Sequence, residues 1–301
     1  MKLPDATKLH DLFEVREVRG KRVFVVDDHH KAFAAWALLR REMGEAPILV
    51  SFDHHTDTMP ACDNRAAVKH PYDSAAYQAF RAEMVAKLGW STDVEVLGSV
   101  AMLKHDEHID AAACCGILRA SFSIQLSDMG GWPALEEEAY YAELQKSWDR
   151  GAAAPPEPKR PFHYKPPEHN VFVVGHECSI GCEAHPHNDA CLPVHASQII
   201  ESVYVEEQLA RAAEMARCIG IEGGIETVPY ILDVDLDVFH TVAAINPRDA
   251  ASFHRLIRGA LAVTIATETE WVDEEWLDEE RQLSSDELLA ALLQPIEQAM
   301  G

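Results

Sequence analysis

Three short segments of the chain are rich in Asp and His, and each follows an apolar run. These segments are Asp27-Asp28-His29-His30, Asp53-His54-His55-Thr56-Asp57 and Asp233-Val234-Asp235-Leu236-Asp237. Carboxylates and imidazoles together suit Mn²⁺, Fe²⁺ or Zn²⁺ better than Ca²⁺, which prefers oxygen ligands alone. Each segment taken singly is also typical of a turn or a helix cap. Three of them after three apolar runs favour a shared metal site.

The spacing within the segments indicates what such a site would do. Alternate residues just past a strand point the same way, so two sets of side chains are expected to share a face. The sets are Asp53, His55 and Asp57, and Asp233, Asp235 and Asp237. Carboxylates held this close need a counter-charge, which a pair of divalent ions supplies. Two ions that share a water generate hydroxide near neutral pH, so hydrolytic chemistry is expected.

Strands and helices alternate along the sequence and must position these side chains. Strands are predicted at residues 21–26, 47–52, 94–97, 121–126, 170–174, 229–234 and 261–266. Helices are predicted at residues 31–43, 74–88, 110–120, 197–218, 247–258 and 284–300. This alternation predicts a three-layer α/β/α domain over residues 1–301, with a mainly parallel sheet. Ligands bind at the carboxyl ends of such strands, where all three segments fall. The Pro-rich residues 128–168 are interpreted as an excursion or lid within this domain.

Composition narrows the class of partner. The 301 residues include 50 Asp and Glu against 26 Lys and Arg, a formal net charge of -24. Binding to nucleic acid or to an anionic membrane surface needs a basic face on the protein, so neither is expected as a partner. A cationic partner is compatible with the negative net charge. No apolar run reaches the roughly 18 residues of a membrane span. The start of the chain lacks a signal-peptide core, and seven Cys suggest free thiols, so a cytoplasmic location is expected. A homo-oligomer is left open.

The three motifs together resemble the arginases and other ureohydrolases. In that superfamily successive strands end in Asp-His, Asp-x-His-x-Asp and Asp-x-Asp, which here read Asp28-His29, Asp53 to Asp57 and Asp233-Val234-Asp235. The resemblance implies the three-layer fold and two Mn²⁺, with Fe²⁺ or Zn²⁺ as alternatives. Carried over by position, one ion would be held by His29, Asp53, Asp57 and Asp233, and the other by Asp53, His55, Asp233 and Asp235.

Departures from the usual ureohydrolase motifs point to a divergent branch. Val26-Asp27 stands where Gly-Gly usually precedes Asp-His, and the late motif DVDLDVF lacks the usual flanking Ser and Pro. These features resemble the branch that includes peptide arginases, which convert arginine residues in a peptide to ornithine with release of urea. The resemblance therefore implies a cationic guanidino substrate, and an arginine-containing peptide is preferred.

The resemblance also implies three catalytic residues, which are the metal ligand Asp57, His70 and Glu268. His70 lies where the superfamily carries its proton shuttle, although a plain loop His would look the same, and His105 and His108 are rivals. Glu268, at the end of a late strand, would hold the guanidinium cation; an acid in an acidic stretch is the alternative.

Three further residues are assigned to substrate binding, which are Asp237, Glu177 and His187. Glu177 and His187 lie in the segment 176–195, which is dense in Cys and His. That segment could instead hold zinc, although its spacing matches no standard paired Cys motif.

Two other functions remain open. One is a deacetylase-type amidohydrolase with a single zinc on Asp53, His55 and Asp233. The other is a metal-dependent binding protein without catalysis.

Overall fold

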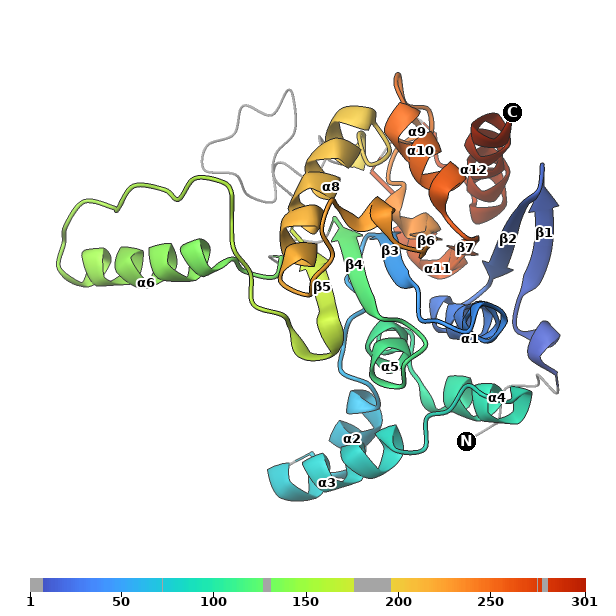
Figure 1. Cartoon of the computed structure of the whole chain (residues 1–301), viewed down its shortest axis with the longest axis horizontal. Coiled ribbons are helices and arrows are strands. Elements are labelled where there is room, and N and C mark those ends of the chain that lie inside the picture. Colours follow the sequence, from blue (N-terminus) through green and yellow to red (C-terminus); the bar gives the residue numbers. More distant parts are fainter. Residues whose placement is uncertain (1–7, 72, 127–130, 176–195, 275, 278–280) are drawn as a thin grey trace.

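The computed structural model describes residues 8–71, 73–126, 131–175, 196–274, 276–277 and 281–301. Its centre is a seven-stranded sheet in the order β1-β2-β7-β6-β3-β4-β5 (Figure 1). The strands are β1 Glu14–Val18, β2 Lys21–Val26, β3 Ile48–Asp53, β4 Ala120–Gln125, β5 Val171–Val174, β6 Tyr230–Asp235 and β7 Val263–Ala266. Only β1 is antiparallel to its neighbour, so the predicted mainly parallel sheet is confirmed.

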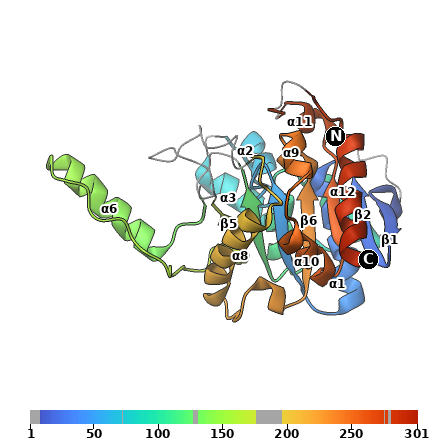
Figure 2. The ribbon, with the colours of Figure 1, turned by 90° about the horizontal axis from the view of Figure 1, so that it is seen from above.

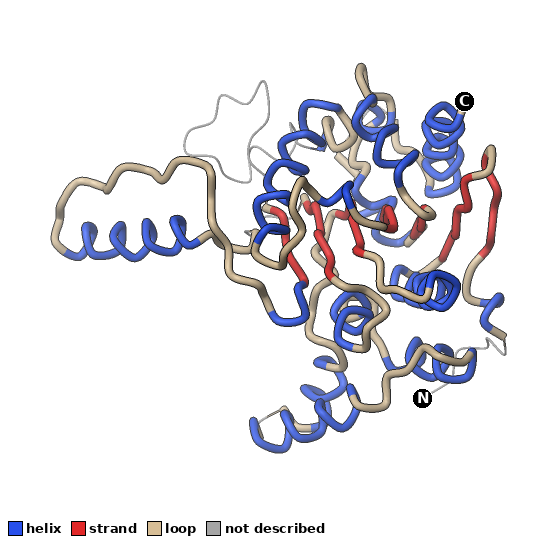
Figure 3. Tube along the Cα trace, in the orientation of Figure 1, coloured by secondary structure: helices blue, strands red, loops and turns tan. Residues whose placement is uncertain are grey.

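Helices cover both faces of the sheet (Figure 3). The α-helices are α1 Ala32–Met43, α2 Asp63–Lys69, α3 Ser74–Val85, α4 Asp93–Met102, α5 His108–Cys114, α6 Leu135–Asp149, α8 Ser202–Arg217, α9 Val242–Ile245, α10 Ala251–Gly259, α11 Thr269–Glu274 and α12 Ser285–Met300. Short 3-10 helices are η1 Leu9–Asp11, η2 His29–Lys31, η3 Glu168–Asn170, η5 Ile225–Thr227 and η6 Leu236–Val238. One layer contains α1, α4 and α5, and the other contains α8, α10 and α12 (Figures 1 and 2). The predicted three-layer α/β/α architecture is therefore confirmed.

The two faces of the sheet differ in polarity. Leu232 and Val234 of β6 belong to the apolar core beneath α8, α10 and α12, whereas Ile231 belongs to the core beneath α1 and α5. Because side chains alternate along a strand, Asp233 and Asp235 lie on the same face as Ile231. Strands covered on both faces are usually apolar throughout, so buried carboxylates inside β6 need a specific partner.

One predicted element differs in the structure, and one strand of the structure was not predicted. Residues 94–97, predicted as a strand from their Val content, lie in helix α4. Thr92 caps this helix by accepting a hydrogen bond from the Glu95 amide, and the Glu95 carboxylate accepts from the Thr92 amide. This reciprocal capping box outweighs the β preference of a short run. The edge strand β1 was not predicted at all.

The Pro-rich excursion leaves the sheet between β4 and β5 and contains helix α6, which the sequence did not predict. Figures 1 and 2 show α6 projecting from the three layers. None of its residues is buried, and its return segment is bound by a hydrogen bond between the His163 ring and the Glu136 carboxylate (2.6 Å). The lid role stays a prediction. Within the described residues, no helix combines the length and the apolar character that crossing a bilayer requires.

Candidate metal centre

Strand register brings the predicted segments to one rim of the sheet. Ser51 of β3 lies opposite Asp233 of β6, and Asp233 lies opposite Thr264 of β7. Two residues further on, β3 ends at Asp53 and β6 ends at Asp235. These two carboxylates therefore lie side by side where parallel strands end, as the sequence predicted.

His29 is at the middle of this rim and is fully buried. Its Nδ1 atom lies 3.0 Å from Asp57 Oδ2, 3.1 Å from Asp235 Oδ2 and 3.5 Å from Asp53 Oδ2. Burial alone would lower the pKa of His29, but the charges of Asp233 and Asp235 raise it well above its ordinary value. One imidazole nitrogen thus faces three carboxylates, and their ligand atoms lie close enough together to suit a metal ion.

A second group of donors lies beside the first and shares one residue with it. Ligand atoms of Asp53, His55 and Asp237 lie within 4.8 Å of one another. The His55 Nδ1 atom is 3.1 Å from Asp237 Oδ2, and the His55 amide donates to Asp53 Oδ1 (2.7 Å). Asp237 is held in place by the His54 amide, which donates to its Oδ1 atom (3.2 Å). Because Asp53 belongs to both groups, it is placed to bridge two ions.

The electrostatics of these groups indicate a missing counter-charge. Burial raises the pKa of Asp53 and of Asp235 well above the usual value, and the charges of neighbouring carboxylates raise both further. The buried Asp53 Oδ2 atom has no hydrogen-bond partner, and the three carboxylates near His29 Nδ1 form no well-aligned hydrogen bond with it. Buried polar atoms without a partner are rare in native proteins and need an explanation. Divalent ions would supply it, and this mixture of carboxylates and imidazoles fits Mn²⁺, Fe²⁺ or Zn²⁺.

The structure does not bring Asp233 into these donor groups, although the sequence suggested it as a bridging ligand. Its Oδ2 atom accepts hydrogen bonds from Ser51 Oγ (2.9 Å) and His29 Nε2 (2.8 Å), and its Oδ1 atom accepts from Thr264 Oγ1. Strand β6 runs on through Asp235, so Asp233 lies one pleat inside the sheet. Asp237, assigned to substrate binding from the sequence, takes the donor position instead. The segment DVDLD contains two overlapping Asp-x-Asp pairs, and nothing local to it distinguishes them.

A third group adds a histidine that the sequence offered only as a rival proton shuttle. Ligand atoms of His29, Asp57 and His108 lie within 4.8 Å of one another. The buried His108 ring stacks on Trp36 (centroids 5.3 Å apart), and its Nδ1 atom is 2.8 Å from the carbonyl oxygen of His105. The Nε2 atom of His108 is buried without a hydrogen-bond partner. The spacing of the KHDEHID segment gave no sign that His108 would pack beside His29.

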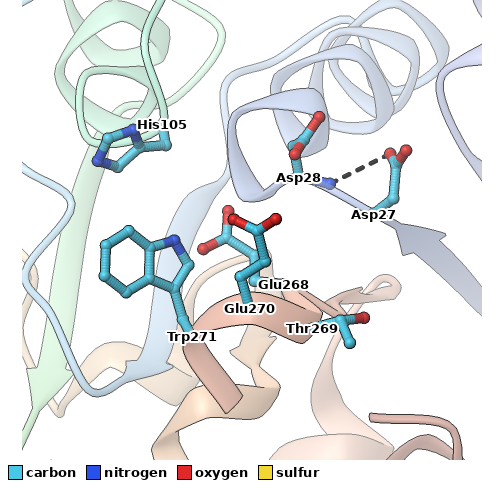
Figure 4. Close-up of a pocket in the computed structure, with 7 residues that line it drawn as sticks. All are labelled: Asp27, Asp28, His105, Glu268, Thr269, Glu270 and Trp271. Atoms are coloured by element: carbon cyan, nitrogen blue, oxygen red, sulfur yellow. Dashed lines mark hydrogen bonds between the residues drawn. The ribbon is translucent and has the colours of Figure 1, made fainter. Parts of the chain in front are cut away.

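Glu268, the predicted cation-binding residue, lies next to the centre. Its backbone φ is 23°, a left-handed value that turns the chain sharply after β7, and its Oε1 atom accepts from the His29 amide (2.7 Å). Burial raises the pKa of Glu268. The side chain lines a pocket of about 300 Å³ (Figure 4), together with Asp27, Asp28, His105, Thr269, Glu270 and Trp271. The Trp271 ring lies 5.9 Å from the ring of His55, so the pocket adjoins the donor groups.

The other predicted residues lie elsewhere. His70 ends α2 and packs edge-on against Phe80 (centroids 5.6 Å apart), and none of its described contacts reaches the donor groups. Its role as proton shuttle stays a prediction. Glu177 and His187 fall outside the described residues, and so does the zinc site suggested for residues 176–195.

No family model matches the sequence, and no curated protein matches it. Among solved structures, the chain is similar to proclavaminate amidino hydrolase from Streptomyces clavuligerus and to a hypothetical agmatinase from Burkholderia thailandensis. Each is 12% identical to this chain with a TM-score of 0.37, and each match covers 92% of this chain. The chain spans 62% and 57% of the lengths of those two proteins, respectively.

Proposed function

We propose that this protein is a metal-dependent hydrolase of a guanidinium group, with two divalent ions at the carboxyl rim of the sheet. His29, Asp53, Asp57 and Asp235 would hold one ion, and Asp53, His55 and Asp237 would hold the other. The observation that carries the proposal is the sharing of Asp53 between two donor groups, together with the lack of a hydrogen-bond partner for the buried Asp53 Oδ2 atom. Mn²⁺ is the preferred ion, in line with the ureohydrolase-like motifs, and Fe²⁺ or Zn²⁺ also suits the donors.

The protein side chains would bind and orient the substrate. When bound, the ions would lower the pKa of a coordinated water and so supply a nucleophile near neutral pH. The Glu268 carboxylate lies beside the donor groups and would accept hydrogen bonds from the guanidinium nitrogens. The Trp271 indole offers a flat face on which a planar cation can stack. Burial of the carboxylates excludes bulk water, which strengthens each of these interactions.

A proton must also reach the leaving amine. Of the three histidines that the sequence suggested for this role, His105 is the one among the residues that line the pocket. Its ring lies 6.2 Å from the ring of Trp271, across the pocket from Asp27 and Asp28 (Figure 4). A ring nitrogen of His105 is therefore the described group best placed to deliver the proton.

The charge of the pocket supports a substrate whose guanidinium is not accompanied by a free carboxylate. Four of the lining residues are acidic, and Lys31 offsets only one of the two negative charges of Asp27 and Asp28, since its single Nζ atom lies 2.6 Å from Asp27 and 2.7 Å from Asp28. The remaining acids, Glu268 and Glu270, attract a cation and repel a carboxylate. An arginine residue within a peptide meets this condition better than free arginine does. Hydrolysis would then give an ornithine residue and urea.

The single-zinc deacetylase alternative fits the structure less well. It would need Asp233 as a ligand, but both oxygens of Asp233 already accept hydrogen bonds inside the sheet. It would also leave the buried carboxylates around His29 without a counter-charge.

Metal analysis and mass spectrometry test the proposal together. The chain should bind two Mn²⁺, and an arginine-containing peptide amide should lose the mass that separates arginine from ornithine, with urea released in equal amount. A peptide with lysine in place of arginine is the control. Reaction of free arginine but not of the peptide would overturn the substrate assignment. Two bound ions without turnover of any guanidino compound would leave a binding protein instead of an enzyme.

A further inference from the structure

A buried chain of hydrogen bonds lies behind His29, on the side away from the donor groups. The Trp36 Nε1 atom donates to Thr264 Oγ1 (3.2 Å), and the Thr264 hydroxyl donates to Asp233 Oδ1. Asp233 Oδ2 in turn bonds to His29 Nε2 (2.8 Å) and accepts from Ser51 Oγ (2.9 Å). All five residues are buried.

The register of the strands builds this chain. Ser51 on β3 and Thr264 on β7 are the direct neighbours of Asp233 on either side of β6. Their hydroxyls therefore reach the carboxylate from both flanks, while His29 approaches it from η2 above the sheet face. A carboxylate that is fully buried in a sheet is costly unless each oxygen accepts hydrogen bonds, and here each oxygen does.

The direction of each hydrogen bond follows from the chemistry of Trp36. An indole N–H can only donate, so the Thr264 oxygen must accept from Trp36 and direct its own hydrogen to Asp233. The Ser51 hydroxyl likewise points its hydrogen to Asp233, which accepts on both oxygens. His29 Nε2 must then be a donor, and a neutral ring that donates from Nε2 carries its lone pair on Nδ1. Nδ1 is the atom that faces Asp53, Asp57 and Asp235.

We propose that Asp233 is a positioning residue, which holds His29 in the Nε2–H form so that Nδ1 is presented to the first metal ion. Ser51, Thr264 and Trp36 set the direction of the hydrogen bonds around it. This inference rests on the proposed metal centre and gives Asp233 a role other than that of a ligand. Carboxylates behind a histidine ligand commonly fix its ring orientation and its tautomer, and their loss weakens metal affinity roughly 10- to 100-fold.

Two kinds of variant test the role of Asp233. Asp233→Asn keeps the size of the side chain but brings an N–H group against donors, so the affinity for the first Mn²⁺ should fall roughly 10- to 100-fold. Thr264→Val keeps the shape and removes the hydroxyl, and it should weaken the same ion less strongly. Thr264→Ser restores the hydroxyl and should restore affinity. Competition with a fluorescent chelator measures each of the two dissociation constants.

Histidine ring NMR adds a measurement that a merely structural role would not change. In protein loaded with diamagnetic Zn²⁺, ¹⁵N shifts should show His29 protonated on Nε2, and Asp233→Asn should alter that signal. The His29 signal is assigned by its loss in His29→Ala. An unchanged tautomer together with wild-type affinity in Asp233→Asn would overturn the inference. So would complete loss of one ion in Asp233→Asn with no effect of Thr264→Val, because Asp233 would then be a ligand.

Failure of the metal centre itself gives a different result. If the wild-type chain binds no Mn²⁺ and no Zn²⁺, the proposed function fails before any variant is compared. If Asp233→Asn does not fold, the Thr264→Val and Thr264→Ser pair still decides whether the hydrogen-bond chain controls the affinity of the first ion.

Discussion

Replacing Asp53 by Asn should stabilise the metal-free protein and also abolish its stabilisation by Mn²⁺. The Asp53 side chain is 1% exposed, and its Oδ2 atom has no hydrogen-bond partner. Without an ion, this carboxylate faces the charge of Asp235 within the same donor group. An amide of the same shape removes the charge and can still accept the His55 amide hydrogen bond, but it cannot bridge two cations.

The size of the effect can be bounded in two ways. Donor atoms of Asp53 and Asp235 lie within 4.8 Å, and two unit charges at that separation repel by roughly 3.5 kcal/mol at an effective dielectric constant of about 20. If Asp53 instead stays protonated at about pH 7.5, holding that proton costs at most roughly 5 kcal/mol relative to an unfolded pKa of about 3.9. Attraction to protonated His29 offsets part of either cost. A gain of about 3 kcal/mol is expected, which corresponds to a rise of roughly 5 °C in Tm.

Thermal unfolding after dialysis against chelator, with and without added Mn²⁺, measures both halves of this prediction. Glu45→Gln, which removes an acid from the exposed surface, is the matched control and should change neither quantity. A metal-free Asp53→Asn protein with an unchanged or lower Tm would show that the carboxylates are not in mutual repulsion. A variant that keeps the full Mn²⁺ response would show that Asp53 is not a shared ligand.

Three further predictions concern the second ion, the pocket and pH. Asp237→Asn should bind one Mn²⁺ per chain instead of two by elemental analysis, and two retained ions would return Asp237 to substrate binding. Trp271→Ala should raise KM for a guanidino substrate by roughly 5- to 30-fold with a smaller change in kcat, since an aromatic face contributes about 1–2 kcal/mol to cation binding. An equal loss in kcat would contradict a binding role for Trp271. In the metal-free protein, burial raises the pKa of Asp53 and Asp235 above the unfolded value of about 3.9. The protons on these two carboxyl groups therefore stabilise the fold at low pH. This stabilisation is lost as pH rises through the folded pKa. Because Mn²⁺ replaces those protons, its effect on Tm should be larger at pH 8 than at pH 5, and a pH-independent shift would argue against binding at these acids.

Local sequence patterns were sufficient to predict the scaffold of this site. Apolar, β-branched runs such as residues 21–26 and 47–52 form strands because both faces of a parallel sheet are buried, and polar residues follow where such strands end. The capped helix 284–300 was equally clear from its Ser-Ser-Asp start. The same reasoning failed for residues 94–97 and 135–149. In the first case a helix cap outweighed a short Val-rich run, and in the second a helix with no buried face left no apolar period to detect.

The sequence by itself determined that Asp and His side chains gather at one rim of a parallel sheet, because residue type and strand order are sufficient for that conclusion. It also singled out Glu268, which the fold brings against His29 from more than two hundred residues away. Only the tertiary structure decided which Asp residues of DVDLD face the donor groups. Local chemistry is the same for both overlapping pairs, whereas pairing with Ser51 and Thr264 places Asp233 inside the sheet and Asp235 at its end. A shift of two residues keeps every side chain on the same face, so no periodic pattern in the sequence can reveal it, and the register against neighbouring strands settles it.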